Sequence, residues 1–165
     1  MIPEQILTAA GQAMQHGDWP SVERILQEGL AKHPGHPDLL GTMAIAMFRS
    51  GRPQQSVEWF RHAAEAGGRA SDYINLGSAL CDVGRFAEAY DVLHKVAAEA
   101  SEDAFVRFCM ARALAGLGRH PEALGHIGAA IAASPDDVDF RIFRARLAVE
   151  LDRWDMALAD LNALP

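Results

Sequence analysis

The stretch from Asn75 to Leu93 is Asn-Leu-Gly-Ser-Ala-Leu-Cys-Asp-Val-Gly-Arg-Phe-Ala-Glu-Ala-Tyr-Asp-Val-Leu. Two short amphipathic runs meet in it at Gly84-Arg85. A small residue, Gly77, lies midway along the first run, and another, Ala89, lies near the start of the second. Two antiparallel helices joined by a short turn approach closely only where side chains are small. The same pattern recurs along the whole chain, which indicates internal repeats.

Four sequence columns recur with a spacing of 33 or 34 residues. The turn column is Gly17, Gly51, Gly84, Gly118 and, in the same role, Asp152. Seven residues earlier stand the small residues Ala10, Ala44, Gly77, Ala111 and Ala145. Five residues later stand Val22, Ser56, Ala89, Ala123 and Ala157, and nine later the large apolar Leu26, Phe60, Leu93, Ile127 and Leu161. One spacing kept in four columns over five copies predicts stacked helix pairs.

This pattern resembles the tetratricopeptide repeat, whose unit of 34 residues is a helix pair. Leu76, Gly77 and Leu80 match the family's Leu-Gly followed by Tyr or Leu. The mid-repeat alanine is matched by Ala89, Ala123 and Ala157, and the closing proline by Pro34 and Pro135. Gly68 and Ser101 depart from the closing proline, and the first-helix tryptophan is replaced by Ile6, Leu40, Tyr73, Arg107 and Arg141.

The resemblance implies an all-α, right-handed superhelical solenoid of antiparallel helix pairs, with about ten helices in about four and three-quarter bacterial-type repeats. We expect one domain over 1–165, with repeats at about 3–36, 37–69, 70–103, 104–137 and an incomplete 138–165. Caps, prolines and periodicity predict helices at about Pro3–His16, 19–32, Pro37–Ser50, Pro53–Ala66, Ser71–Val83, Ala87–Glu99, Asp103–Leu117, Pro121–Ala133, Val138–Leu151 and Asp155–Leu164.

Composition excludes several classes of function. The formal net charge of −7 argues against nucleic acid as the main partner, because phosphates require clustered Lys and Arg. The N-terminus has no basic region followed by an apolar run, so we expect no signal peptide. No run of apolar residues in the sequence is long enough to form a membrane-spanning helix. Two cysteines fit a reducing compartment, and we expect the cytoplasm.

In the family that the chain resembles, the first helix of each pair lines a concave groove. Its outward positions here are unusually apolar for a solvated surface. The groove residues that we predict are Leu7, Met14, Ile45, Phe48, Arg49, Ile74, Asn75, Ser78, Phe105, Phe108, Arg112, Ile142 and Arg146. The alternative is that some of these side chains pack against neighbouring helices. The carboxylate clamp of chaperone-binding repeats is absent, and Asn75 alone keeps the asparagine ladder of glycosyltransferase-linked repeats.

We predict no enzyme, no cofactor and no metal site. His33 and His36 lie in a turn without a Cys or carboxylate at ligand spacing. Cys81 and Cys109 map to the groove side of adjacent repeats, too far apart for a disulfide, and we interpret them as core thiols. No Ser-His-Asp pattern, phosphate-binding loop or dinucleotide motif occurs.

The leading hypothesis is a protein–protein interaction scaffold that binds an apolar peptide or helix of a partner protein in the groove. Phe48, Phe105 and Phe108 would anchor the partner, and Asn75 and Arg112 would orient it. The alternatives are a repeat arm of a larger protein, for example ahead of a glycosyltransferase-like domain, a chaperone like those of type III secretion, and a self-assembling scaffold.

The last predicted helix has more apolar residues than one buried side can absorb: Met156, Leu158, Leu161 and Leu164. Either the natural chain continues past Pro165, which we favour, or this face meets another copy. In both cases we expect the chain to self-associate at high concentration, through this uncapped helix or through the groove.

Overall fold

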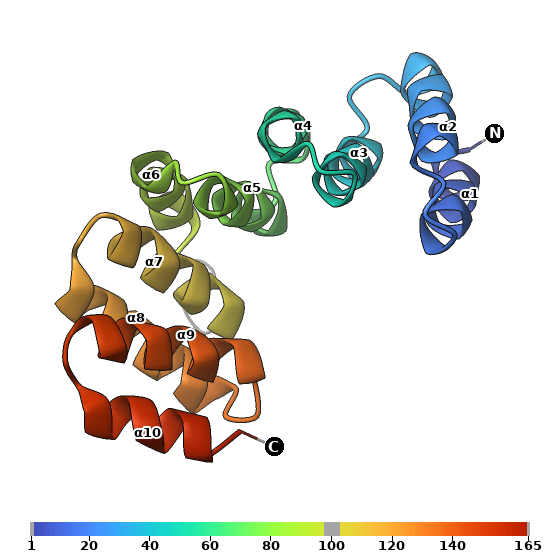
Figure 1. The fold of residues 1–165 in the computed structure, drawn as a ribbon. Helices are drawn as coiled ribbons and strands as arrows, with labels where there is room; N and C mark the ends of the chain where they lie inside the picture. The colour runs from blue at the N-terminus through green and yellow to red at the C-terminus, as the bar shows by residue number, and fades with distance from the viewer. Residues whose placement is uncertain (1, 98–102, 165) are drawn as a thin grey trace. The chain divides into compact units, whose positions relative to one another are not determined.

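The computed structural model describes residues 2–97 and 103–164 (Figure 1). In them lie ten α-helices and no strand. The helices are α1 Pro3–Gln15, α2 Trp19–Lys32, α3 Pro37–Arg49, α4 Pro53–Gly67, α5 Ala70–Asp82, α6 Phe86–Val96, α7 Ala104–Gly116, α8 His120–Ala133, α9 Val138–Glu150 and α10 Trp154–Asn162. The all-α class is therefore confirmed, and most helix ends lie within one residue of the prediction. The predicted end of the sixth helix at Glu99 and the closing position Ser101 lie outside the described residues.

The turn column behaves as the repeat spacing predicts. Gly17, Gly51, Gly84 and Gly118 all have a positive φ. Asp152 has a φ of 56° and is the one described residue other than glycine with a positive φ. Side chains are disfavoured in this conformation, although Asp tolerates it better than most residues. The chain therefore makes the same left-handed turn in all five copies, including the copy that lacks glycine.

The chain divides into two compact units, Met1–Val83 and Gly84–Pro165. The first holds α1 to α5 and the second holds α6 to α10, so the division falls inside the predicted third repeat. Within each unit, every helix packs against the next one along the chain. The single domain over 1–165 stays a prediction.

The two columns of small residues, seven positions before and five positions after each turn residue, lie at the centre of the helix packing. Their side chains are buried in every described copy, from Ala10 and Val22 in the first pair to Ala145 and Ala157 in the last. In the large apolar column Leu26, Leu93 and Ile127 are fully buried. Leu161 departs from it, because it is 50% exposed. Trp154 and Leu158 on the same helix are exposed as well, so α10 has the apolar surface that the sequence predicts.

Arginines in the turns tie consecutive helix pairs together. In the first unit, Nη1 of Arg52 donates to Glu23 of the preceding pair at 3.1 Å. In the second unit, the Arg119 guanidinium lies 4.7 Å from the centre of the Tyr90 ring and also pairs with Glu122. Hydrogen bonds to Glu122 and then Tyr90 raise the pKa of Arg119. Each of these arginines contacts a residue 29 positions earlier in the sequence, so the two contacts join equivalent positions of consecutive repeats.

Candidate functional site: the first-helix face

Exposed large apolar side chains are concentrated on the first helices of the pairs. We call the outward surface of α1, α3 and α5 in the first unit, and of α7 and α9 in the second, the first-helix face of that unit. Phe48 on α3 is 44% exposed and Phe105 on α7 is 42% exposed, and Ile45 and Ile142 are also exposed. Within the described part of the chain, the second helices α2, α4, α6 and α8 expose no large apolar side chain. The exception is the last second helix, α10, which exposes Trp154, Leu158 and Leu161; in the pairs before it the two sides differ in exposed apolar surface.

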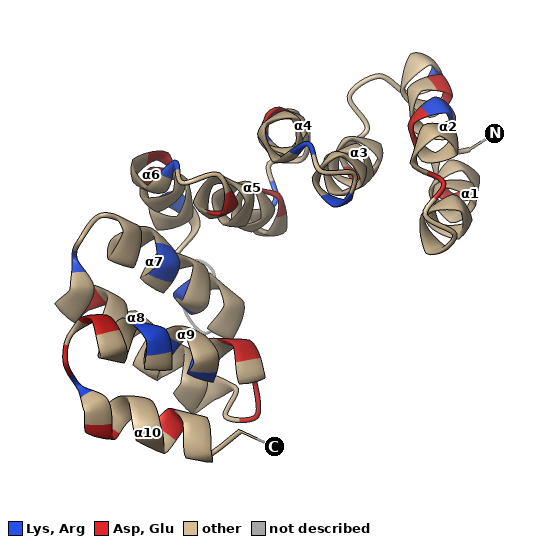
Figure 2. Cartoon of the chain, in the orientation of Figure 1, with Lys and Arg blue, Asp and Glu red and all other residues tan. Residues whose placement is uncertain are grey.

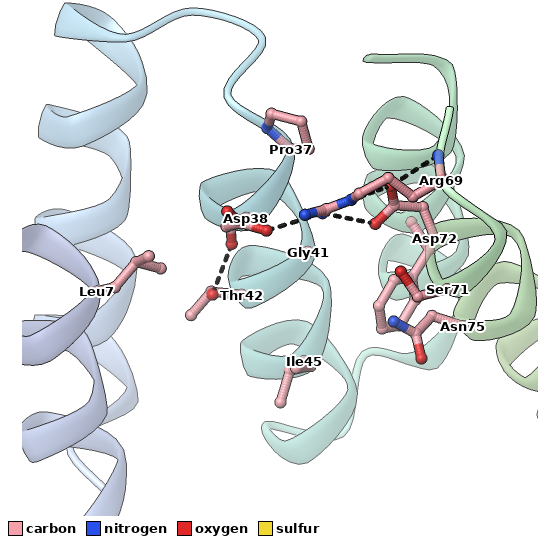
Figure 3. A pocket seen from close by; sticks show the side chains of 11 residues that line it. Leu7, Pro37, Asp38, Gly41, Thr42, Ile45, Arg69, Ser71, Asp72 and Asn75 are labelled. Atoms are coloured by element: carbon pink, nitrogen blue, oxygen red, sulfur yellow. Dashed lines mark hydrogen bonds and ion pairs between the residues drawn. The ribbon is translucent and has the colours of Figure 1, made fainter. Parts of the chain in front are cut away.

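A pocket of about 320 Å³ opens on the first-helix face of the first unit (Figure 3). Leu7 of α1 lies across it from Ile45 of α3, and Asn75 of α5 closes another side. The pocket thus unites three predicted groove residues from three different repeats. Gly41 leaves open space, because a Cβ built on it meets no atom within 4 Å.

A polar cluster forms one wall of this pocket. Nε of Arg69 donates to Oδ2 of Asp72 at 2.8 Å, and Nη2 donates to Oδ1 of Asp38 at 2.7 Å (Figure 3). Hydrogen bonds to Asp72 and then Asp38 raise the pKa of the Arg69 guanidinium. Arg69 therefore links α3 to α5. The sequence pattern did not predict these three residues as part of the site, because they lie outside the repeated columns.

Gly67, the last residue of α4, allows Asp72 to approach. A Cβ on Gly67 would lie 2.2 Å from Oδ2 of Asp72 and 3.0 Å from Cβ of Pro37. Asp72 is buried and held by Arg69, so it cannot move away freely. We therefore expect Gly67→Ala to lower the free energy of unfolding by about 1–2 kcal/mol, although Ala normally favours a helix over Gly.

The matched control is Gly128→Ala in α8, where an added Cβ meets nothing within 4 Å. This change should raise stability by up to about 1 kcal/mol. Urea unfolding of both variants measures the difference. Equal stabilisation by the two substitutions would show that the contact between α4 and Asp72 is loose.

The remaining predicted residues of the first unit divide between surface and core. Phe48 and Arg49 are exposed, and within the described residues Arg49 makes no ion pair. Met14 and Leu7 are half-buried and pack against the core around Ile6 and Leu39. Ser78 is half-buried.

Three residues that map to the groove side are core residues instead. Ile74 is only 9% exposed, so its side chain is packed between helices and does not offer a surface. Cys81 and Cys109 are buried free thiols, in agreement with their interpretation as core residues.

In the second unit, aromatic side chains join α7 to α9. The Phe108 ring centre lies 4.8 Å from that of Phe140 and 5.5 Å from that of Phe143. Phe105 lies 6.2 Å from Phe108 and remains exposed. The Arg112 guanidinium lies over the Phe108 ring, 5.6 Å from its centre. Phe108 is therefore half-buried and contributes to the packing of α7 on α9, whereas Phe105 is a surface residue.

A second pocket, of about 310 Å³, lies between α9 and α10. Its lining includes the predicted residues Ile142 and Arg146, together with Val149, Glu150 and Leu161. Figure 2 shows basic residues along both α7 and α9. The first-helix face of this unit thus combines apolar and basic groups.

Family models of the tetratricopeptide repeat match residues 13–80 and 110–165, together most of the chain. The chain belongs to the tetratricopeptide repeat proteins, as the columns of small residues predicted. This fold is a scaffold for protein–protein interaction. None of the described helices has the length and apolar character needed to cross a membrane.

Solved structures of the same fold cover nearly the whole chain. MamA 41-end from Desulfovibrio magneticus RS-1 is 19% identical, with a TM-score of 0.83 over 96% of this chain and 90% of that one. The pilF protein of Pseudomonas aeruginosa is 16% identical, with a TM-score of 0.82 over 97% of this chain and 73% of that one. At these identities the likeness concerns the fold alone. No curated protein matches the sequence significantly.

Proposed function

We propose that this chain is a non-enzymatic scaffold that binds an apolar segment of a partner protein on its first-helix face. The observation that carries the proposal is that α3, α7 and α9 expose large apolar side chains, whereas the second helices α2, α4, α6 and α8 expose none within the described residues. Single exposed apolar residues are ordinary, but a set that lies on the first helices, with the terminal helix α10 as the one exception among the described helices, is typical of an interaction surface. Ile45 and Phe48 on α3, with Phe105 on α7, would then lose their contact with water on binding.

Each unit supplies its own apolar contacts in this proposal. In the first unit, the pocket beside Leu7 and Ile45 accepts an apolar side chain, and the Asn75 amide at its edge can hydrogen-bond to the partner. In the second unit, Phe105 extends the packed cluster around Phe108 to the surface. Arg49 follows Phe48 in the last turn of α3 and is exposed, so it adds a positive charge at that end of the helix.

The test is selection of peptides from a displayed random library on the purified chain. We expect the selected peptides to be rich in apolar residues. Phe105→Ala should weaken their binding roughly tenfold, because a buried aromatic anchor contributes strongly to an interface. Since Phe105 is exposed in the free protein, its loss should leave the urea midpoint nearly unchanged.

Phe108→Ala provides an internal comparison, because the Phe108 ring also contacts Phe140 and Phe143. It should reduce both binding and stability. Gln55→Ala, on an exposed position of the second helix α4, should change neither. Selection of no apolar peptide, or unchanged binding by Phe105→Ala, would refute the proposed surface.

A further inference from the structure

We propose that α10 is the contact surface of a symmetric dimer, in which the α10 helices of two copies of this chain pack antiparallel about a twofold axis near Leu158. This inference does not depend on the proposed function, because Phe105 lies on α7 and the pocket beside Leu7 is formed by α1, α3 and α5. It explains why α10 exposes large apolar side chains whereas the earlier second helices do not.

The column of large apolar residues shows what kind of surface α10 offers. In three earlier pairs, the column residue is fully buried in a cluster with a residue of the following first helix: Leu26 with Leu39 of α3, Leu93 with Met110 of α7, and Ile127 with Phe140 of α9. Leu161 holds the same place on α10 but is 50% exposed, because no helix of the described chain covers it. The outer surface of α10 therefore has the form of a surface that packs against a helix.

Three large apolar side chains form one stripe along α10. Trp154, Leu158 and Leu161 are 56%, 58% and 50% exposed, and their spacing of four and three residues places them on one side of the helix. The pocket of about 310 Å³ between α9 and α10 adjoins this stripe, because Leu161 lines it together with Ile142 and Val149. Trp154 lies roughly 10 Å along the helix axis from Leu161.

A twofold axis near Leu158 makes this stripe complementary to itself. Antiparallel packing brings Trp154 of one copy opposite Leu161 of the other, and the two Leu158 side chains opposite each other. Each Trp154 then enters the pocket beside Leu161 of the other copy, where the apolar Ile142 and Val149 receive its ring. The three stripe positions are uncharged, and antiparallel helices place opposite ends of their dipoles together.

The first helix of the chain offers no matching surface for a head-to-tail stack. All exposed residues of α1 are polar: Glu4, Gln5, Thr8, Gln12 and Gln15. Packing α1 of one copy on α10 of the next would bury some of these groups without partners, which costs free energy. A contact in which one surface meets its own copy avoids this cost and closes at two copies. The second copy is therefore the occupant that fits α10.

The contact is small, so the dimer should be weak. Ile142 and Val149 on α9 are exposed beside the stripe on α10. With their surroundings, these side chains give an interface on the order of 1,000 Å² in total, at the low end of specific protein contacts. We therefore expect a dissociation constant in the micromolar range. Because the stripe is uncharged and each copy has a formal charge of −7, added salt should strengthen the dimer.

Sedimentation velocity over a dilution series of the full chain, from about 300 µM to about 3 µM, tests the dimer. Trp154→Ala should weaken it at least about tenfold by removing the anchor. Leu158→Glu should do the same by placing two carboxylates face to face. Leu158→Lys should also weaken it, but an equimolar mixture of Leu158→Glu and Leu158→Lys should dimerise again at low salt, because opposite charges then meet at the axis.

Leu117→Glu is the matched control, because Leu117 at the C-terminal end of α7 is 39% exposed and lies outside the stripe. It should leave the dimer unchanged, and circular dichroism confirms that each variant is folded. A full chain that is monomeric at every concentration, or equal weakening by Leu117→Glu, would overturn the proposal.

Two further outcomes would also overturn it. If the mixture of Leu158→Glu and Leu158→Lys stays monomeric, Leu158 does not face its own copy. If Phe105→Ala abolishes self-association and Leu158→Glu does not, the copies meet through the first-helix face instead of α10. Failure of the dimer leaves the selection of apolar peptides unaffected, so the two proposals are tested separately.

Discussion

Arg144→Met is expected to lower the free energy of unfolding by about 3 kcal/mol, because it leaves a carboxylate buried without its main partner. Asp160 is only 1% exposed and accepts hydrogen bonds from Nε of Arg144 at 2.8 Å and from Nη2 at 2.5 Å. The hydrogen bond to Asp160 is also the main reason that the pKa of Arg144 is raised. Arg141, at 3.7 Å, is too distant to replace these bonds.

Two further variants make this result interpretable. Arg144→Met/Asp160→Leu should regain much of the loss, since an apolar pair of similar volume can replace a buried ion pair. Arg24→Met breaks the exposed pair with Glu28 and should cost less than about 1 kcal/mol. Urea unfolding measures all three. A loss for Arg144→Met no greater than that for Arg24→Met would show that the α9–α10 pair does not depend on the buried carboxylate.

Ala123→Leu is expected to destabilise the second unit by about 1–3 kcal/mol through overpacking. Ala123 on α8 is completely buried and packs in a cluster with Leu114 of α7 and Leu147 of α9. A leucine there has no room unless the helices separate, and their close approach is what defines the repeat.

The control is Ala132→Leu, the same change on an exposed position of the same helix. It should alter the free energy of unfolding by no more than about 0.5 kcal/mol. Urea melts that show the two variants to be equally harmless would mean that the small columns do not mark the contact between helices.

The repeated columns account for most of the fold because each has a local steric cause. A small side chain is needed where two helices approach, and a left-handed residue is needed where the chain turns. Asp152 illustrates this: its place in the column identified it as a turn residue, and its φ of 56° confirms it. Such constraints lie within one repeat and are therefore visible in the sequence.

Exposure on the first-helix face is less predictable, because it depends on neighbours as well as on position. Leu7, Gly41, Ile74, Phe108 and Ile142 share one repeat position. Ile74 is 9% exposed and Ile142 is 38% exposed, although both are isoleucine. The pattern specifies which side of a helix a residue takes, but the side chains of adjacent helices determine how much of it is covered. A contact that occurs in one repeat only, such as that of Arg69 with Asp38, leaves no recurring pattern in the sequence and so could not be predicted from it.

The central claim is that partner segments bind on the first-helix face, and photo-cross-linking tests it most directly. A library-selected peptide carrying a benzophenone side chain at an apolar position would be cross-linked to the full chain, and the modified residues identified by mass spectrometry. We predict cross-links on α3, α7 and α9, near Phe48, Phe105 and Ile142. Cross-links confined to the second helices α2, α4, α6 and α8 would contradict the claim.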